Sequence, residues 1–243
     1  MLIASFPAGP LQANCYLVAP AAGAGCVVID PGQASADGVA GLVREHDLTP
    51  EAVLITHGHF DHMWDASPVA RTYDVPVWIH PADRHLLADP MAAISNDSAQ
   101  MLREQLGMTE VPDFTEPADV RDASDGATIE AAGLTFTVDH TPGHTPGTVA
   151  YRVDYVPQPQ GGRELPPGPE DVSQLMFTGD FLFAGSIGRT DLNGGDHDAM
   201  LASLASKVLP LPDNIVVLPG HGPQTTVGRE RATNPFLAEL VER

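Results

Sequence analysis

The run His57-Gly58-His59-Phe60-Asp61-His62 constrains what this chain can form more than any other stretch of its sequence. It places three imidazoles and one carboxylate within six positions, directly after the apolar segment Val53-Leu54-Ile55-Thr56. Imidazole nitrogens and carboxylate oxygens are the ligands that zinc and related transition metals prefer. Gly58 gives the backbone freedom to bend sharply, so that neighbouring side chains can point toward more than one position. A histidine-rich surface loop is the alternative, but this density of metal-competent groups favours a metal site.

Three later segments repeat one order: an apolar, strand-like run, a turn that contains glycine, and then a histidine or aspartate. The run 134–138 precedes His144, the run 175–178 precedes Asp180, and the run 215–218 precedes His221. Because α/β proteins place functional groups at the carboxyl ends of strands, we expect the four turns to meet at one edge. The resulting ligand set exceeds the needs of one tetrahedral zinc and suits two metals that share a bridging carboxylate. The candidate ligands are His57, His59, Asp61, His62, His144, Asp180 and His221.

The charge of the chain restricts its partners. Acidic residues number 32 against 12 basic ones, and the formal net charge is -20. A field of this sign repels nucleic-acid phosphates and anionic lipid, so we expect neither nucleic acid nor a membrane as a partner. Lys207 is the only lysine, so an anionic substrate must be held by arginines or by the metals.

The first residues and the cysteines indicate the compartment. Residues 1–18 lack a basic segment followed by an uninterrupted apolar core, and no apolar run approaches the ~20 residues of a transmembrane helix. Cys15 and Cys26 lie in apolar, strand-like segments, so we expect two buried thiols in preference to a disulfide. These features predict a cytoplasmic protein.

Local patterns predict a strand-rich opening followed by alternating helices and strands. A helix is expected over Ser35–His46, with Ser35 as its N-cap, and another over Met63–Tyr73, interrupted or reset around Pro68. With no convincing linker, residues 1–243 form one mixed α/β domain in this interpretation. The other expected elements are strands over Leu2–Phe6, Ala13–Ala19, Cys26–Asp30, Val75–Ile79, within Val120–Val138 and over Val149–Val153, and helices over Pro81–Leu87, Ser98–Leu106, Asp196–Val208 and Asn234–Val241.

Three features outside the ligand pattern have open alternatives. Residues 157–171 contain eight Pro or Gly among fifteen, which favours an exposed, irregular surface loop, with a lid over the site as the alternative. Arg189 either holds a carboxylate of the substrate or forms a structural ion pair with Asp191. His140 either supports a ligand or, like His46, His80, His85 and His197, is an ordinary surface histidine.

The ligand pattern H-x-H-x-D-H followed by His144, Asp180 and His221 resembles that of the metallo-β-lactamase-fold hydrolases. The segments Asn14–Val18 and Ile29–Gly32 are similar to the opening strands of that family, so the resemblance spans roughly the whole chain. The segments 178–192, 220–226 and 234–237 are similar to its short, single-domain glyoxalase II-like branch. The resemblance implies a four-layer αββα sandwich with the metal site at one edge of the two sheets.

The resemblance also implies how the ligands are divided. His57, His59 and His144 would bind one metal, Asp61, His62 and His221 the other, and Asp180 would bridge them, with Asp61 and Asp180 counted as catalytic. Zinc is the expected metal, and iron at one or both sites is the alternative. The implied reaction is hydrolysis of a small acyl thioester such as S-lactoylglutathione by a metal-bridging hydroxide. We further expect Arg189 and Arg229 to contact an anionic part of the thiol carrier.

Three other functions stay open at this stage. A mono-iron persulfide dioxygenase of the same superfamily would use His57, His144 and Asp180 as a two-histidine, one-carboxylate site. The sequence Ser-Ile-Gly at residues 186–188 favours hydrolysis over persulfide oxidation. A lactonase or another hydrolase of the fold is the next alternative. A non-enzymatic, metal-stabilised binding protein is the alternative from a different class.

Overall fold

The computed structural model describes residues 1–93, 114–157 and 171–241. The helix expected over 98–106 lies outside these ranges, and so does nearly all of the Pro/Gly-rich loop 157–171. Within the described part of the chain, no helix has both the length and the apolar character needed to cross a bilayer.

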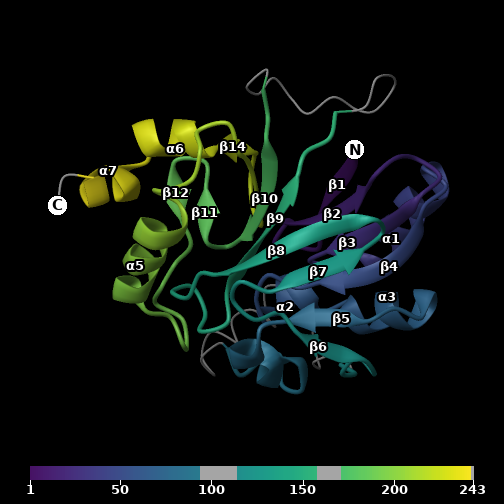
Figure 1. Cartoon of the computed structure of the whole chain (residues 1–243). Coiled ribbons are helices and arrows are strands. Elements are labelled where there is room, and N and C mark those ends of the chain that lie inside the picture. The colour runs from purple at the N-terminus through teal and green to yellow at the C-terminus, as the bar shows by residue number, and fades with distance from the viewer. Residues whose placement is uncertain (94–113, 158–170, 242–243) are drawn as a thin grey trace.

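Two six-stranded sheets, stacked against each other, form the centre of the described structure (Figure 1). The first sheet has the order β1-β2-β3-β4-β5-β6, made of β1 (Leu2–Ala8), β2 (Ala13–Ala19), β3 (Gly25–Ile29), β4 (Thr49–Leu54), β5 (Val77–Ile79) and β6 (Val120–Asp122). The second has the order β14-β13-β10-β9-β8-β7, made of β14 (Thr225–Thr226), β13 (Val216–Pro219), β10 (Gln174–Gly179), β9 (Val149–Asp154), β8 (Leu134–His140) and β7 (Thr128–Ala131). A small hairpin pairs β11 (Leu182–Phe183) with β12 (Ser186–Ile187).

Both faces of each sheet are apolar, and the side chains of each strand alternate between these two faces. In β2, Tyr16 and Val18 belong to the core between the sheets, whereas Cys15 and Leu17 belong to a second core on the outer face. Successive side chains of a strand point to opposite faces, so a strand covered on both sides is a nearly continuous apolar run. The two cysteines are buried and free, as predicted.

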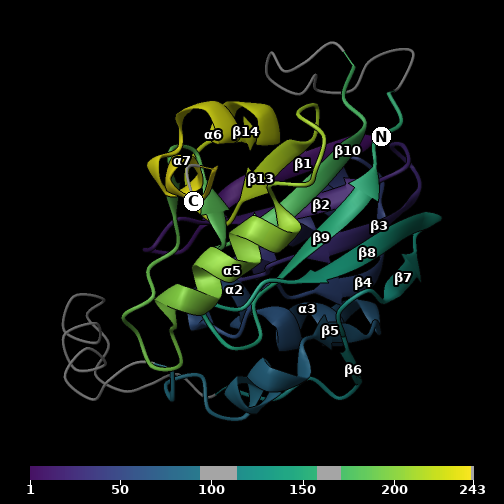
Figure 2. The ribbon, with the colours of Figure 1, turned by 60° about the vertical axis from the view of Figure 1, so that its left-hand side comes forward.

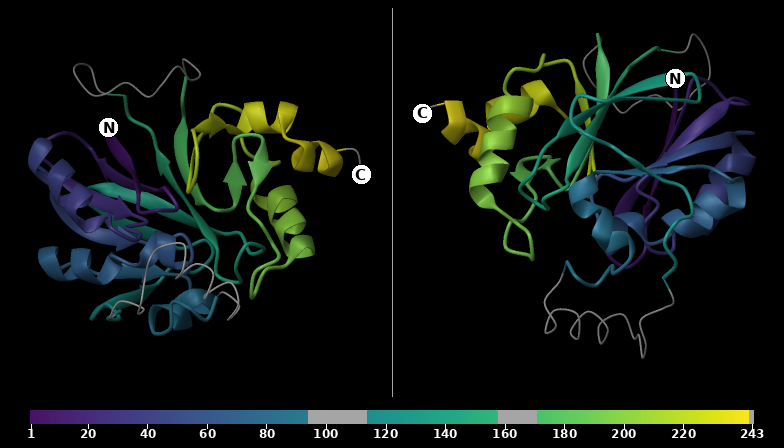
Figure 3. Two further views of the ribbon diagram at one scale, coloured as in Figure 1. Left: turned by 180° about the vertical axis from the view of Figure 1, so that it is seen from behind. Right: turned by 60° about the horizontal axis from the view of Figure 1, so that its bottom comes forward.

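Helices cover the outer face of each sheet. α1 (Ala36–Glu45) and α3 (Ala66–Tyr73) pack on the first sheet through Val39 and Val69, among others. α5 (His197–Lys207), α6 (Val227–Thr233) and α7 (Pro235–Val241) pack on the second, and Figure 2 shows α5 lying across it. The views in Figure 3 show the two groups of helices on opposite flanks of the sheets. The predicted αββα sandwich is therefore confirmed.

The helix predicted over 63–73 is two helices, and its break does not fall at Pro68. α2 (Phe60–Met63) ends before Asp65, whose backbone N–H donates to the carbonyl of Pro31 at 2.9 Å. Pro68 lies in the first turn of α3, where a missing N–H costs no intrahelical hydrogen bond. Ser35 is the N-cap residue of α1, as predicted, but its side chain makes no capping hydrogen bond. The carboxylate of Asp65 takes this role, accepting from the N–H of Ala36 at 2.8 Å.

Several other boundaries differ from the predicted ones. The region 120–138 contains β6, β7 and the first part of β8, and Asp30 lies just beyond β3 with φ of 50°. Residues 81–87 form a 3₁₀ helix, η1 (Pro81–Leu87). The short elements β11, β12, β14 and α6 were not predicted, because runs of two to seven residues carry little periodic signal.

Replacement of Phe136 by alanine tests the packing between the sheets. Phe136 is fully buried in the central core, so Phe136→Ala should lower the free energy of unfolding by about 3–5 kcal/mol through lost burial and the cavity left behind. Urea denaturation of the metal-bound protein measures this change. Leu11→Ala, at a side chain that is 41% exposed, is the control and should change it by less than about 0.5 kcal/mol. Equal effects of the two variants would contradict the assigned core.

Candidate metal centre

The structure brings all seven candidate ligands together at the carboxyl ends of four strands. His57 and His59 follow β4 of the first sheet, and Asp61 and His62 lie in α2, which begins directly after His59. His144 lies between β8 and β9, Asp180 follows β10, and His221 follows β13, all from the second sheet. The ligands form three overlapping groups in which the possible ligand atoms lie within 4.8 Å of one another.

His57, His59 and His144 form the first group. Their ring centroids lie 4.5–4.8 Å apart, and all three side chains are buried. The Nε2 atom of each ring is buried without a hydrogen-bond partner. Buried polar atoms are normally satisfied, because leaving one unpaired costs about 1–3 kcal/mol. Three unpaired imidazole nitrogens in mutual proximity fit a bound metal ion.

Asp61, His62 and His221 form a second group. The Nε2 atom of His221 lies 3.3 Å from Oδ2 of Asp61 and 3.3 Å from Nε2 of His62. The remaining pair, Nε2 of His62 and Oδ2 of Asp61, is separated by 3.5 Å. Ligand atoms around a tetrahedral zinc with bonds of ~2.0–2.1 Å lie roughly 3.3–3.4 Å apart. The spacing of this group therefore fits one metal ion.

Asp180 lies between the two groups. Its Oδ2 atom is 3.7 Å from Nε2 of His144 and 3.6 Å from Nε2 of His221, and its Oδ1 atom is 3.3 Å from Nε2 of His62. This position matches the bridging role that the sequence resemblance implied. Gly220 leaves room for the Asp180 carboxylate beside His62, because a Cβ atom at position 220 would lie 2.3 Å from Oδ1 of Asp180 and 2.6 Å from Cε1 of His62.

A buried carboxylate outside the predicted set orients two of the imidazoles. Asp30 accepts from the backbone N–H of Thr56 at 2.7 Å and from its hydroxyl at 2.6 Å, and its Oδ2 lies 3.0 Å from Nδ1 of His62. The same hydroxyl lies 3.1 Å from Nδ1 of His57. Each ring is thus held at Nδ1 and turns Nε2 toward the centre, an arrangement that is common around metal sites. The one signal for Asp30 in the sequence is its place in the family-like segment 29–32.

Arg189 contributes through its backbone. Its carbonyl oxygen lies 2.7 Å from Nδ1 of His144, which leaves Nε2 of that ring facing the centre. Its guanidinium donates to the carboxylate of Asp191 at 2.7 and 2.8 Å, and both side chains are exposed. Arg229 is exposed on α6. Among the described residues, neither guanidinium forms a hydrogen bond or ion pair with any of the seven ligands, and Arg189 forms the ion pair with Asp191 that was one of its two alternatives.

The other histidines lie outside the three ligand groups. His85 and His197 are exposed, and His46 is half-buried beside Glu45. His140 stacks on His80 with ring centroids 3.9 Å apart, and its Nε2 lies 2.9 Å from the carbonyl of Pro146, two residues after His144. This contact reaches the loop that carries His144 but not the imidazole of His144 itself, whose Nδ1 is paired with Arg189.

The two groups of ligands differ in their affinity for protons. Burial, together with the neighbouring imidazoles, holds the pKa of His57 well below its usual value and lowers the pKa of His59 to about 3. Burial also opposes a charge on His62 and His221, but the adjacent carboxylates outweigh it and raise the pKa of both rings. The same imidazoles overcome the effect of burial on Asp61 and Asp180, whose pKa values are lowered.

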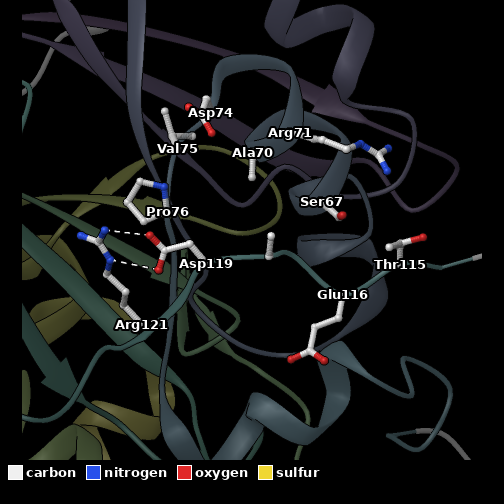
Figure 4. Close-up of a pocket in the computed structure, with 11 residues that line it drawn as sticks. Ser67, Ala70, Arg71, Asp74, Val75, Pro76, Thr115, Glu116, Asp119 and Arg121 are labelled. Carbon is white, nitrogen blue, oxygen red and sulfur yellow. Dashed lines mark hydrogen bonds and ion pairs between the residues drawn. The ribbon is translucent and has the colours of Figure 1, made fainter.

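The structure contains a cavity of about 340 Å³, and Figure 4 shows the side chains that line it. They come from α3, from the segments that precede β5 and β6, and from β6 itself, and they include Arg71, Glu116 and the ion pair of Asp119 with Arg121. None of the seven ligands lines it. The cavity is therefore separate from the candidate metal centre.

As the pH falls, the two groups of ligands should release their metal ions in a fixed order. A raised pKa means that His62 and His221 keep their protons to higher pH, and each proton must leave before the nitrogen can bind a metal. His57 and His59, with lowered pKa values, stay neutral in mildly acid solution. We therefore expect metal to leave the Asp61–His62–His221 group at a higher pH than the three-histidine group.

Equilibrium dialysis at stepped pH with elemental analysis measures this order. Of the two groups that meet at Asp180, His59→Ala leaves only the Asp61–His62–His221 group complete and His221→Ala leaves only the three-histidine group complete, so the two variants identify which group releases its ion. Release from both variants at one pH, or first from His221→Ala, would contradict the order.

Comparison with known proteins shows the family of this chain. Residues 8–156 match the model of the metallo-beta-lactamase superfamily. The probable metallo-hydrolase YqgX of Bacillus subtilis is 36% identical over 95% of both chains. Hydroxyacylglutathione hydrolase GloC of Haemophilus influenzae is 31% identical over 98% of both chains.

Two solved structures share the fold over nearly the whole chain. The B3 metallo-beta-lactamase BLEG-1 superposes with a TM-score of 0.76 at 35% identity, covering 97% of this chain and 99% of that one. TTHA1623 in a di-iron-bound form superposes with a TM-score of 0.68 at 38% identity, covering 94% and 97%. The fold, the ligand pattern and these similarities together show that the chain belongs to the metallo-beta-lactamase superfamily, whose members include metal-dependent hydrolases.

Proposed function

We propose that this protein is a two-metal hydrolase of small acyl thioesters of the S-lactoylglutathione type. The observation that carries the proposal is the pair of ligand groups that meet at Asp180, because this arrangement suits two ions acting on one substrate. The similarity to GloC, named a hydroxyacylglutathione hydrolase, supports the choice of substrate.

The residues of the centre would hold two divalent ions. Zinc suits the imidazole and carboxylate ligands, and iron at one or both positions is the alternative, which the similarity to a di-iron-bound structure supports. When bound, the ions would supply a water whose pKa falls to ~7 and would polarise the substrate carbonyl. Two carboxylates against two divalent ions leave a positive centre that favours the oxyanion of the tetrahedral intermediate. Asp180, between the groups, would fix the distance between the two ions.

The protonation of the carboxylates favours a substrate with a good leaving group. The pKa values of Asp61 and Asp180 are lowered, so both are ionised near neutral pH and neither carries a proton to donate. A thiol with a pKa of roughly 8.5 leaves as a thiolate without a strong general acid. A lactone or a β-lactam releases a more basic alkoxide or amine, for which proton donation matters more. This difference supports a thioester as the substrate.

The metal content and the reaction are tested together. The proposal predicts about two divalent ions per chain and a kcat/KM for S-lactoylglutathione at least about 100-fold above that for a lactone or a β-lactam, or about 2.7 kcal/mol in activation free energy. Asp180→Ala should abolish turnover, whereas His197→Ala, at an exposed histidine, should not change it. One iron per chain with oxygen uptake on glutathione persulfide and negligible thioesterase activity would overturn the proposal in favour of the dioxygenase.

Arg189 is proposed to bind an anionic part of the thiol carrier by exchanging Asp191 for the substrate carboxylate. Its guanidinium is exposed and lies on the segment whose backbone holds His144, which places it near the centre. Arg189→Ala should raise KM while metal content and melting temperature stay nearly unchanged, because an exposed ion pair contributes little to stability. Arg229→Ala tests the second predicted arginine in the same assay. A large fall in melting temperature with unchanged KM would identify Arg189 as a purely structural residue.

A further inference from the structure

Asp83 is a fully buried carboxylate that is not one of the seven candidate ligands. It lies in η1, and it accepts three hydrogen bonds. The donors are the backbone N–H of Gly58 at 2.8 Å, the hydroxyl of Thr145 at 2.6 Å and the backbone N–H of Gly147 at 2.7 Å. All three bonds have the length of strong hydrogen bonds to a charged acceptor.

These donors belong to the two loops that carry the three-histidine group. Gly58 separates His57 from His59, and Thr145 directly follows His144. One carboxylate therefore fastens the loop of the first sheet to the loop of the second sheet. A backbone hydrogen bond from Val149 to the carbonyl of Thr56, at 2.8 Å, also joins the two sheets nearby. Asp83 adds direct hydrogen bonds to both ligand loops, whose imidazole Nε2 atoms make no hydrogen bonds of their own.

The two glycines provide the space that Asp83 needs. A Cβ atom on Gly147 would lie 2.5 Å from Cγ of Asp83, and one on Gly58 would lie 3.2 Å from its Cβ and 2.5 Å from Cδ1 of Leu86. Neither glycine has a positive φ. Close approach, and not a bend that only glycine permits, thus explains both positions, and this corrects the role that the sequence suggested for Gly58.

We propose that Asp83 is a positioning residue for the three-histidine metal site, setting its affinity by holding His57 and His59 at a fixed distance from His144. Ligands must be held within about 0.5 Å of the productive geometry for tight binding. Loss of a group that positions metal ligands typically lowers metal affinity 10–100-fold. The inference rests on the proposed two-metal centre but not on the choice of substrate, and metal binding is its readout.

Asp83→Asn tests this role in two backgrounds. Of the two groups that meet at Asp180, His221→Ala leaves only the three-histidine group complete, and Asp83→Asn should lower its Zn²⁺ affinity about 10–100-fold. Of the same two groups, His59→Ala leaves only the Asp61–His62–His221 group complete, and Asp83→Asn should alter its affinity by less than about twofold. Competition with a chromophoric chelator measures both affinities, and Co²⁺ absorption reports the geometry of each site. Equal losses in the two backgrounds, or no loss in His221→Ala, would overturn the proposal.

Glu230→Gln is the matched control for loss of a buried carboxylate. Glu230 is also fully buried and accepts from the N–H of Gly185, the hydroxyl of Thr225 and the amide of Asn234, none of which lies on the two ligand loops. The Glu230→Gln variant should lower the melting temperature without changing the Zn²⁺ affinity in the His221→Ala background. An affinity loss equal to that of Asp83→Asn would overturn the proposal.

Thr145→Val keeps the test decisive if Asp83→Asn does not fold. It removes one of the three bonds to Asp83 and keeps the size of a buried side chain. It must weaken the three-histidine site selectively, and unchanged Zn²⁺ affinity in this variant would overturn the proposal. Binding of fewer than two ions by the unmodified protein would instead count against the proposed function, while the His221→Ala comparison still decides the role of Asp83.

Discussion

Desolvation of a dense group of imidazoles and carboxylates is the interaction on which the rest of this structure depends. Five histidines and two aspartates lie where the two sheets meet, and four of those histidines are only slightly exposed or fully buried. Burial lowers the pKa of His57 and His59, while neighbouring opposite charges raise the pKa of His62 and lower that of Asp180. Outer contacts from Asp30, Thr56 and the carbonyl of Arg189 hold the Nδ1 atoms of His62, His57 and His144, so that Nε2 of these rings faces the centre. These contacts and the ion pairs within the cluster offset part of the cost of burying such groups.

The ligands were predictable from the sequence because each follows a local rule. A buried strand, a turn with glycine and a polar residue form a pattern that is visible within about ten positions, and four copies of it indicated a common edge. Local patterns predicted only a mixed α/β domain, and the order of its layers was implied by the family resemblance. Helix boundaries were less predictable: the break before Asp65 depends on Pro31, a contact that no local pattern contains.

The supporting residues were not predictable, because their roles arise from distant contacts. Asp83 is separated by 62 and 64 positions from two of its three partners, and no spacing rule connects them. The structure, and not the sequence, explains the role of the family-like segment 234–237. There, Asn234 donates to the carbonyl of Ser186 at 3.0 Å and to Glu230 at 2.9 Å, which fastens the hairpin of β11 and β12 to α6.

The division of each ligand group between distant parts of the chain has a consequence for folding. His62 and His221 are 159 positions apart, so an ion held by both closes a very long loop. In the chain-entropy model, a cross-link of this length lowers the entropy of the unfolded chain by the equivalent of roughly 5 kcal/mol. During synthesis, residues 57–62 leave the ribosome long before His144 and His221 exist to complete either group. The nascent chain therefore carries an incomplete, metal-attracting segment until its last strands have formed.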